Sequence, residues 1–262
     1  MNSTRNKLSL GRPPTERLAV RFAFSFGVVL FCIVCAPTAF ADVLYTFDGT
    51  SIDTNTWRLT QPQNISQNNA LFLTGASNPG SPAQLTTKDV ALGIGGSAQV
   101  QITFTAHTSQ TNFLPKAWLG LTTDDSKRFV GFDSYAVSTE LDIAPAYSPG
   151  YSAFYYYGGG FGNGVGKSFS VALDTLYSLR LERLTDTSVR YTVLDSANSI
   201  IAQNTRTLPS FTDPLYVAIG SVSVDATFDN LQLSGNIILV PEPSVPLLLA
   251  VGVAAALWRK RV

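Results

Sequence analysis

The feature that most constrains the fold is an alternation of apolar and polar side chains, with a period of two, that recurs between residues 42 and 239. It is clearest in residues 177–193, where apolar side chains occupy every second position on both sides of the turn Thr185-Asp186-Thr187. Such alternation gives each strand of a hairpin one apolar and one polar face. Because helical periodicity is almost absent from the same region, the pattern predicts an all-β domain.

Short strands bounded by turn residues are expected throughout this region. Besides the hairpin, they are predicted at residues 43–47, 70–73, 98–106, 116–122, 128–134, 153–157, 168–172, 199–204, 215–219 and 227–233. So many short alternating strands predict a two-sheet antiparallel sandwich, whereas a parallel sheet would show continuous apolar runs and crossover helices. The chain has no internal repeat of fixed period, which disfavours propellers and solenoids. A β-helix is the alternative fold.

Residues 1–41 are predicted to be a signal peptide. Basic residues precede an apolar run at 22–36, and Ala39 and Ala41 provide the small residues that signal peptidase accepts. Cleavage is therefore expected before Asp42. The alternative is an N-terminal membrane anchor, for which the apolar run is short. Both cysteines of the chain lie in this segment, so the mature chain has no disulfide or thiol chemistry.

The C-terminal residues 237–262 have the organisation of a second targeting segment. Its parts are the motif Pro241, Glu242 and Pro243, an apolar stretch at residues 245–258, and the basic end Arg259, Lys260 and Arg261. The apolar stretch is marginal for a helix that must cross about 30 Å of hydrocarbon. The basic end is expected to stay in the cytoplasm, so a short transmembrane helix anchors the precursor with its bulk outside.

This arrangement resembles the PEP-CTERM sorting signal of Gram-negative bacteria, which has a Pro-Glu-Pro motif, a short membrane stretch and an Arg-rich end. The resemblance implies that an exosortase reads the signal and cleaves near Pro241-Glu242-Pro243. It also implies a transient inner-membrane precursor that is released to the cell surface or extracellular matrix. An ordinary C-terminal anchor is the alternative.

The net charge of zero is a sum of three unlike parts. Residues 1–41 carry +4, residues 42–239 carry −6 and residues 240–262 carry +2. The region between the two targeting segments is therefore acidic, which disfavours nucleic acid as a partner. The chain has one histidine and two cysteines, so multi-histidine and multi-cysteine zinc sites are excluded.

Three segments resemble concanavalin A-like (laminin G-like) jelly rolls, which include laminarinase-type glycoside hydrolases. They are the opening FDGTSIDTNTW at residues 47–57, the hairpin at 177–193 and the closing Phe228-Asp229-Asn230-Leu231. The similarity spans most of residues 43–234. It implies that residues 42–236 form one jelly-roll domain, a two-sheet antiparallel sandwich of the concanavalin A-like type.

Glu140 and Asp142 are the candidate catalytic pair. Laminarinase-like hydrolases carry a Glu-x-Asp strand that is followed by a further Glu, the general acid, and residues two apart on a strand share a face. Here Ala144 and Pro145 occupy the place of that acid. A chance Glu-x-Asp in a surface loop is the favoured explanation, so no catalytic residue is expected. His107, the only histidine, is interpreted as a solvated loop residue because no nucleophile motif accompanies it.

A tyrosine-rich run followed by glycines, at residues 151–164, is the candidate ligand site. Strand alternation would put Tyr155 and Tyr157 on one face, where tyrosine rings suit stacking on the apolar face of a sugar. Trp118 and Tyr135 are possible partners in this site. The structural alternative is that both faces of the strand serve packing and cross-strand pairing.

Asp48 and Asp229 are candidate ligands for a structural calcium. The terminal strands of related jelly rolls often pair, and calcium prefers carboxylate and carbonyl oxygen ligands. Turn-forming aspartates are the favoured alternative. No other cofactor is expected.

The functional hypothesis is an exported, non-catalytic module that associates with extracellular polysaccharide. Signal peptidase and exosortase are its expected partners during export, and nucleic acid is not a partner. Two alternatives remain open: a divergent laminarinase-like hydrolase or lyase, and a purely structural matrix protein. A neutral glycan or a divalent cation fits an acidic, cysteine-free surface better than an anionic membrane does.

Overall fold

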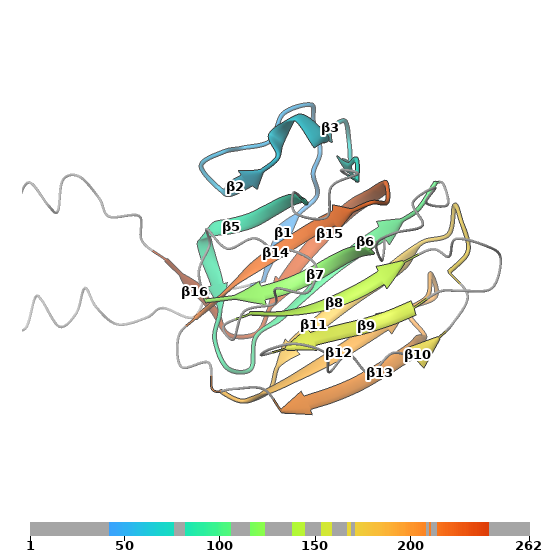
Figure 1. Cartoon of the computed structure of the whole chain (residues 1–262). Helices are drawn as coiled ribbons and strands as arrows, with labels where there is room; N and C mark the ends of the chain where they lie inside the picture. The colour runs from blue at the N-terminus through green and yellow to red at the C-terminus, as the bar shows by residue number, and fades with distance from the viewer. Residues whose placement is uncertain are drawn as a thin grey trace, which may run out of the picture. The chain divides into compact units, whose positions relative to one another are not determined.

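The fold is built from two antiparallel sheets of eight strands each (Figure 1). The structure, a computed structural model of the chain, describes residues 42–75, 82–105, 116–123, 138–144, 153–158, 167–168, 171–207, 210 and 214–240. Every strand pair among these residues is antiparallel. The prediction of an all-β sandwich with two antiparallel sheets is confirmed.

Sheet A carries the candidate site described below. Its strands, from edge to edge, are β10 (Lys167–Ser168), β9 (Ala153–Gly158), β8 (Ser138–Ala144), β7 (Lys116–Thr122), β14 (Leu215–Val222), β5 (Ala83–Leu92) and β16 (Ile237–Leu239), and β2 (Trp57–Thr60) also pairs with β5.

Sheet B contains the predicted hairpin. Its strands, in order, are β13 (Ile200–Thr207), β12 (Ser188–Leu194), β11 (Tyr177–Arg183), β6 (Ser97–Thr103), β15 (Ala226–Ser234), β4 (Leu71–Leu73) and β3 (Ile65–Gln67), and β1 (Val43–Tyr45) also pairs with β15. A short 3-10 helix, η1 (Pro62–Asn64), precedes β3. Strands β11 and β12 form the hairpin, with Leu181 opposite Tyr191.

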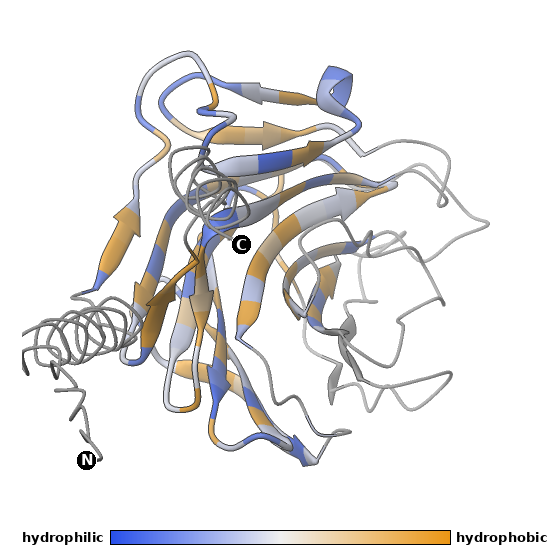
Figure 2. Ribbon diagram, turned by 90° about the vertical axis from the view of Figure 1, so that its left-hand side faces the viewer, coloured by the Kyte–Doolittle hydropathy of each residue, from blue (hydrophilic) through white to orange (hydrophobic). Residues whose placement is uncertain are grey.

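The core is a single cluster of apolar side chains contributed by the inner faces of both sheets. Leu119 and Leu141 reach it from sheet A, and Val100 and Leu181 reach it from sheet B, all without solvent exposure. Figure 2 shows that apolar and polar residues alternate along many of the strands. Each strand thus turns its apolar residues inward, and burial of apolar surface holds the two sheets together.

One buried hydrogen bond ties the sheets together through this core. The hydroxyls of Thr139 on β8 and Tyr191 on β12 lie 2.6 Å apart, and both side chains are fully buried. Because a buried hydroxyl without a partner is costly, this pair stabilises the register of β8 against sheet B.

The strands differ from the predicted ones in two places. Strand β16 pairs with β5, so the sheet continues three residues past residue 236, the predicted end of the domain. The Val240 amide then donates to the Asp89 carbonyl oxygen at 2.7 Å. Strand β5 was not predicted, because polar residues such as Gln84 and Thr86 interrupt its apolar pattern although both are buried.

The predicted targeting segments, residues 1–41 and 241–262, lie outside the described residues. Within the part of the chain that the structure describes, no helix is long and apolar enough to span a membrane.

Candidate functional site

The outer face of sheet A, which points away from sheet B, carries a group of buried polar side chains. On β7, Ala117 and Leu119 point into the core while Lys116 and Trp118 alternate with them on the outer face. On β8, the core residues Leu141 and Ile143 likewise alternate with Glu140 and Asp142. The period of two therefore gathers these charged residues on one face.

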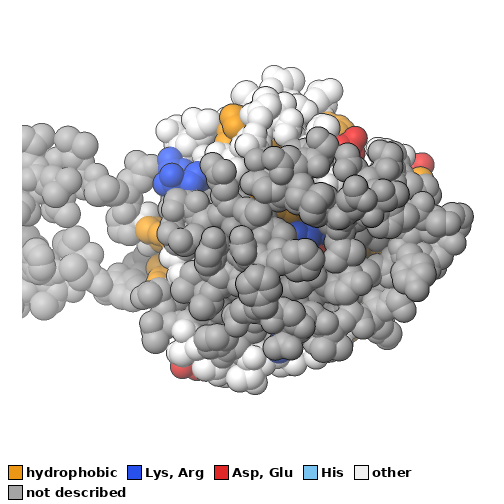
Figure 3. All heavy atoms as spheres, in the orientation of Figure 1, with side chains coloured by type: hydrophobic (Ala, Val, Ile, Leu, Met, Phe, Trp, Pro, Cys, Tyr) orange, Lys and Arg blue, Asp and Glu red, His pale blue; other side chains and the backbone are white. Residues whose placement is uncertain are grey.

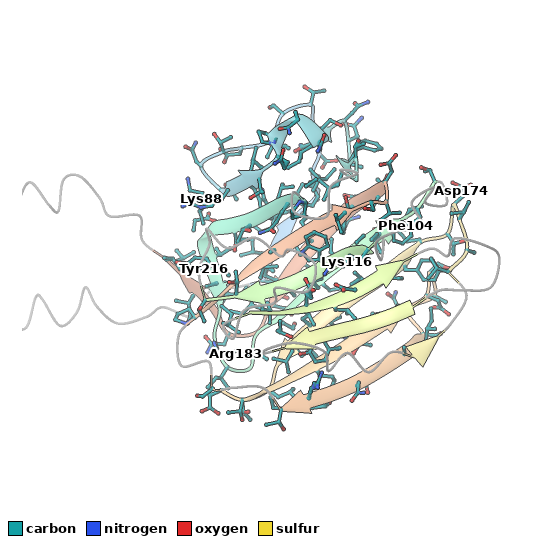
Figure 4. All side chains as sticks on the ribbon, viewed as in Figure 1. Lys88, Phe104, Lys116, Asp174, Arg183 and Tyr216 are labelled. Carbon is teal, nitrogen blue, oxygen red and sulfur yellow. The ribbon has the colours of Figure 1, made fainter. Side chains whose placement is uncertain are left out.

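Lys116, Glu140 and Asp142 form a buried ionic group that we call the carboxylate cluster. The Lys116 Nζ atom lies 2.5 Å from Glu140 Oε1 and 3.3 Å from Asp142 Oδ2. The side chains of the three residues are only 7%, 1% and 2% exposed. Figure 4 places Lys116 near the middle of the sheet, and Figure 3, in the same orientation, shows Lys/Arg colour in the middle of this face. Because solvent hardly screens these charges, each attracts or repels its neighbours more strongly than it would at the surface.

Each carboxylate in the cluster keeps one oxygen that accepts no hydrogen bond from the described residues. These atoms are Glu140 Oε2 and Asp142 Oδ1, and both are buried. Burial raises the pKa of Asp142 well above its ordinary value, and the Glu140 charge raises it further, while Lys116 acts in the opposite direction. The cluster therefore has unused capacity to accept hydrogen bonds, and it carries more negative than positive charge when both carboxyls are ionised.

Trp118 lies beside the cluster. Its ring packs so closely against β14 that position 220 of that strand has room only for a glycine. A Cβ atom at Gly220 would lie 2.2 Å from Trp118 Cζ2, so no larger residue fits without a shift. Lys116 Nζ lies 5.2 Å from the Trp118 ring centroid, within the range of a cation–π interaction. Trp118 also packs with Ala218 and Val222 in a small apolar cluster separate from the main core.

The cross-strand register places a strip of small residues next to the cluster. Glu140 pairs with Gly120, Gly120 with Ala218, and Ala218 with Thr86. In the neighbouring row, Gly220 lies between Trp118 and Gln84. We call Gly120, Ala218 and Gly220 the small-residue strip.

Polar side chains border this strip on both sides. On β5, Gln84 Nε2 donates to Thr86 Oγ1 at 2.9 Å, and on β8 stand the two carboxylates of the cluster. Strands β5 and β8 are three strand spacings apart, or about 14 Å. Small, buried residues therefore lie between two sets of hydrogen-bonding groups and next to the Trp118 indole.

The variant Asp142→Asn tests whether the pKa of Asp142 is raised in the folded chain. Since the folded chain holds the Asp142 proton more tightly than the unfolded chain, the contribution of this residue to stability falls as pH rises from 3.8 towards its higher folded pKa. Asp142→Asn cannot titrate, so its urea unfolding free energy should decrease less over that range than that of the wild type. Asp186→Asn, at an exposed position, is the control. An unchanged pH slope in Asp142→Asn would contradict the assignment.

The structure changes the interpretation of Glu140 and Asp142. The expectation that they lie in a surface loop is wrong, because they occupy the buried strand β8. Burial there is compensated by Lys116, which sequence analysis placed on a strand without a role. The strand ends at Ala144, and Pro145 lies outside the described residues.

The aromatic residues that were predicted to bind ligand differ in where the structure places them. Trp118 lies on the outer face of sheet A beside the carboxylate cluster, but it is fully buried. The register of β9 pairs Tyr155 with Asp142 and Tyr157 with Glu140, so both tyrosines occupy register positions next to the cluster. Tyr135 and His107 lie outside the described residues. Ligand binding by these residues stays a prediction.

The two candidate calcium ligands are close enough to interact electrostatically. Burial raises the pKa of Asp229, and the Asp48 charge adds to this effect, while the Asn230 amide acts against it. Asp48 Oδ2 accepts a hydrogen bond from Thr46 Oγ1 at 2.6 Å. Across the described ranges there is no group of three or more His, Cys, Asp or Glu residues that could hold a metal ion. Calcium binding stays a prediction.

Sequence analysis missed three polar residues of this face, namely Lys116, Gln84 and Thr86. The only signal for Lys116 was its position at the start of an apolar strand, KAWLGLT, where a lysine must either reach solvent or find a partner. The partner comes from a strand that starts 22 residues later, and only the sheet register shows this.

Comparison with solved structures identifies the fold. Lectin II from Ulex europaeus superposes with a TM-score of 0.56 at 8% identity, covering 76% of this chain and all of the lectin. The alginate lyase Aly36B gives 0.53 at 13% identity, covering 78% of this chain and all of the lyase. Winged bean acidic lectin in complex with methyl-α-D-galactose gives 0.51 at 9% identity, covering 76% of this chain and all of the lectin.

Neither the family models nor the curated proteins contain a match to the sequence. The structural likeness nevertheless spans three quarters of the chain and the whole of each neighbour. The predicted jelly roll is therefore confirmed at the level of the fold: the chain has a concanavalin A-like sandwich, similar to those of legume lectins.

Proposed function

We propose that this chain is a non-catalytic glycan-binding module and that the outer face of sheet A is its binding face. The observation that carries the proposal is the carboxylate cluster, with two buried oxygens that accept no hydrogen bond from the described residues. Sugar hydroxyl groups are donors of the kind such oxygens require, and a hydrogen bond to a charged acceptor is about twice as strong as a neutral one. The lectin neighbours support the proposal, since two of them are described in complex with galactose or a galactoside.

The small-residue strip supports the same proposal. A ligand ring that lies over Gly120 and Ala218 can reach the carboxylates on β8 and the Gln84–Thr86 pair on β5 together. Trp118 provides an apolar surface next to this path. Because these side chains are buried in the free chain, binding requires the face to open locally.

A glycan array of the full chain, purified in detergent, tests the proposal. We expect binding to at least one class of glycan, and binding at least about tenfold weaker in the Glu140→Gln, Asp142→Asn double variant. The amides preserve the shape of the carboxylates but lose their charge and half of their acceptor capacity. The control variant carries Asp186→Asn at an exposed position and Asp195→Asn at a half-buried turn position, and it alters the net charge equally. Equal binding by both variants would place the ligand elsewhere.

A glycoside hydrolase or lyase is the second candidate. The observation in its favour is that Glu140 and Asp142 share one buried face of β8, the arrangement that laminarinase-like strands require. The alginate lyase among the structural neighbours has the same fold. Turnover of a β-glucan or of alginate by the full chain, abolished in Glu140→Gln, would favour catalysis over binding.

We further propose that the chain is exported, sorted by an exosortase and released to the cell surface or extracellular matrix of a Gram-negative bacterium. The support is the order of Pro241-Glu242-Pro243, the apolar stretch and the basic end. With Glu242→Ala, the chain should accumulate in the inner-membrane fraction at precursor size. Undiminished release of this variant would contradict sorting through the motif.

Calcium at Asp48 and Asp229 is a separate structural proposal. If it is right, millimolar calcium should raise the melting temperature of the wild type, and chelation should reverse the effect. Asp229→Asn should lose the response while keeping the fold, because within the described residues Asp229 Oδ1 accepts a hydrogen bond only from the neighbouring Asn230 amide. A calcium response that persists in this variant would refute the site.

A further inference from the structure

Among the described residues, the carboxylate cluster has one positive charge too few when both of its carboxyls are ionised. It contains one ammonium group and two carboxyl groups, and all three are at least nine-tenths buried. An unbalanced charge in such a place is costly, and a second cation would remove the cost. Burial and then the Glu140 charge raise the pKa of Asp142, and a proton on that carboxyl is the other way in which the cluster becomes neutral.

Other described residues on this face do not supply the missing charge. The positions that continue the two rows across β14 and β5 are Ala218, Gly220, Gln84 and Thr86, which are all uncharged. Arg58 on β2 pairs with Thr86, but it is exposed and stands four strand spacings, about 19 Å, from β8. At that distance an exposed charge is largely screened.

The vacant hydrogen-bonding capacity lies on the same two side chains as the excess charge. Glu140 Oε2 and Asp142 Oδ1 each have room for a donor, and Lys116 Nζ lies against the other oxygen of each carboxylate. An ammonium group carries three donors and one positive charge, so it can satisfy both oxygens. A hydroxyl group supplies a donor without charge, and a uronate carboxylate supplies neither.

We propose that the carboxylate cluster binds the protonated amino group of an amino sugar, so that the ligand is a glycan containing free glucosamine-type residues. The inference rests on the proposed glycan-binding function and deepens it. It also separates this chain from a binder of uronate polymers such as alginate, whose carboxylates would meet unpaired carboxylate oxygens on this face.

Three hexasaccharides with the same β-1,4 backbone test the inference, because they differ only at carbon 2. They are the glucosamine hexamer, the N-acetylglucosamine hexamer and cellohexaose, which carry an ammonium, an acetamide and a hydroxyl group. Titration calorimetry with the full chain at pH 6 should show the glucosamine hexamer binding at least about tenfold more tightly than cellohexaose. In the Glu140→Gln, Asp142→Asn double variant this preference should disappear.

The control distinguishes a specific site from general attraction to an acidic protein. The Asp186→Asn, Asp195→Asn variant loses two charges outside the cluster, so it should keep the preference if the cluster is responsible. Loss of the preference in this control would overturn the inference. Equal affinity for the glucosamine hexamer and cellohexaose, both weakened by the double variant, would overturn the inference but leave the proposed function standing. If none of the hexasaccharides or array glycans binds, both fail. Circular dichroism of each variant establishes that it is folded.

Discussion

Replacing Lys116 by methionine is expected to destabilise the folded chain by about 3–5 kcal/mol at neutral pH. The side chain volume is nearly kept, but Glu140 and Asp142 then share a buried site without a cation. The loss should shrink as the pH falls, since burial raises the pKa of Asp142 and its protonation removes one of the uncompensated charges. Urea unfolding at pH 7 and at pH 4.5, followed by circular dichroism, measures both effects.

Two further variants test whether the effect of Lys116→Met comes from the buried charges of the cluster. Lys88→Met removes a lysine from the same sheet, but Lys88 Nζ donates to the Thr54 carbonyl oxygen at an exposed position, so a change within about 0.5 kcal/mol is expected. The triple variant Lys116→Met, Glu140→Gln, Asp142→Asn should recover much of the stability, because it contains no buried charge in the cluster. If Lys116→Met and Lys88→Met behave alike, the buried pairing does not exist in solution.

Replacing Gly220 by valine is the second change with a large expected effect. A Cβ atom there meets Trp118 Cζ2 at 2.2 Å and the Ala83 carbonyl oxygen at 2.8 Å. The backbone oxygen cannot move without disturbing the pairing of β5 with β14, so the indole must leave its place. We expect a loss of about 1–3 kcal/mol, the range for overpacked cores.

Tryptophan fluorescence reports the displacement directly. Trp118 is fully buried in the wild type, so its emission should shift to the red in Gly220→Val as the ring meets water. Because Trp57 and Trp258 also emit, the comparison is made in a background in which both are phenylalanine. Ser221→Val, at a buried position on the inner face of the same strand, controls for general overpacking. An unshifted spectrum in Gly220→Val would show that Trp118 does not pack on Gly220.

The fold was largely predictable from the sequence where apolar and polar residues alternate or where a short apolar run stands between turn residues. The hairpin β11–β12 follows from alternation and a turn, and β7 has the predicted bounds although it is buried on both faces. Strand β5 could not be predicted in this way, because it is buried on both faces and its polar residues satisfy one another or neighbouring strands. Thr87 Oγ1, for example, donates to the Val90 carbonyl oxygen and accepts from the Val217 amide.

The candidate site was only half predictable. The Glu-x-Asp spacing correctly indicated that Glu140 and Asp142 share a face, but buried carboxylates are rare unless they are paired, so a surface loop was the natural interpretation. The pairing residue, Lys116, is 24 positions away in sequence. Its contact depends on β7 and β8 lying side by side with Trp118 opposite Asp142, and local periodicity carries no information about that register.

We propose that the outer face of sheet A binds glycan through the carboxylate cluster. The most direct test is a crystal structure of the full chain with the glycan that binds best on the array. We expect the glycan to lie along the small-residue strip, with one of its donor groups within hydrogen-bonding distance of Glu140 Oε2 or Asp142 Oδ1. A glycan bound on sheet B or at a sheet edge, with both oxygens still lacking a donor, would contradict it.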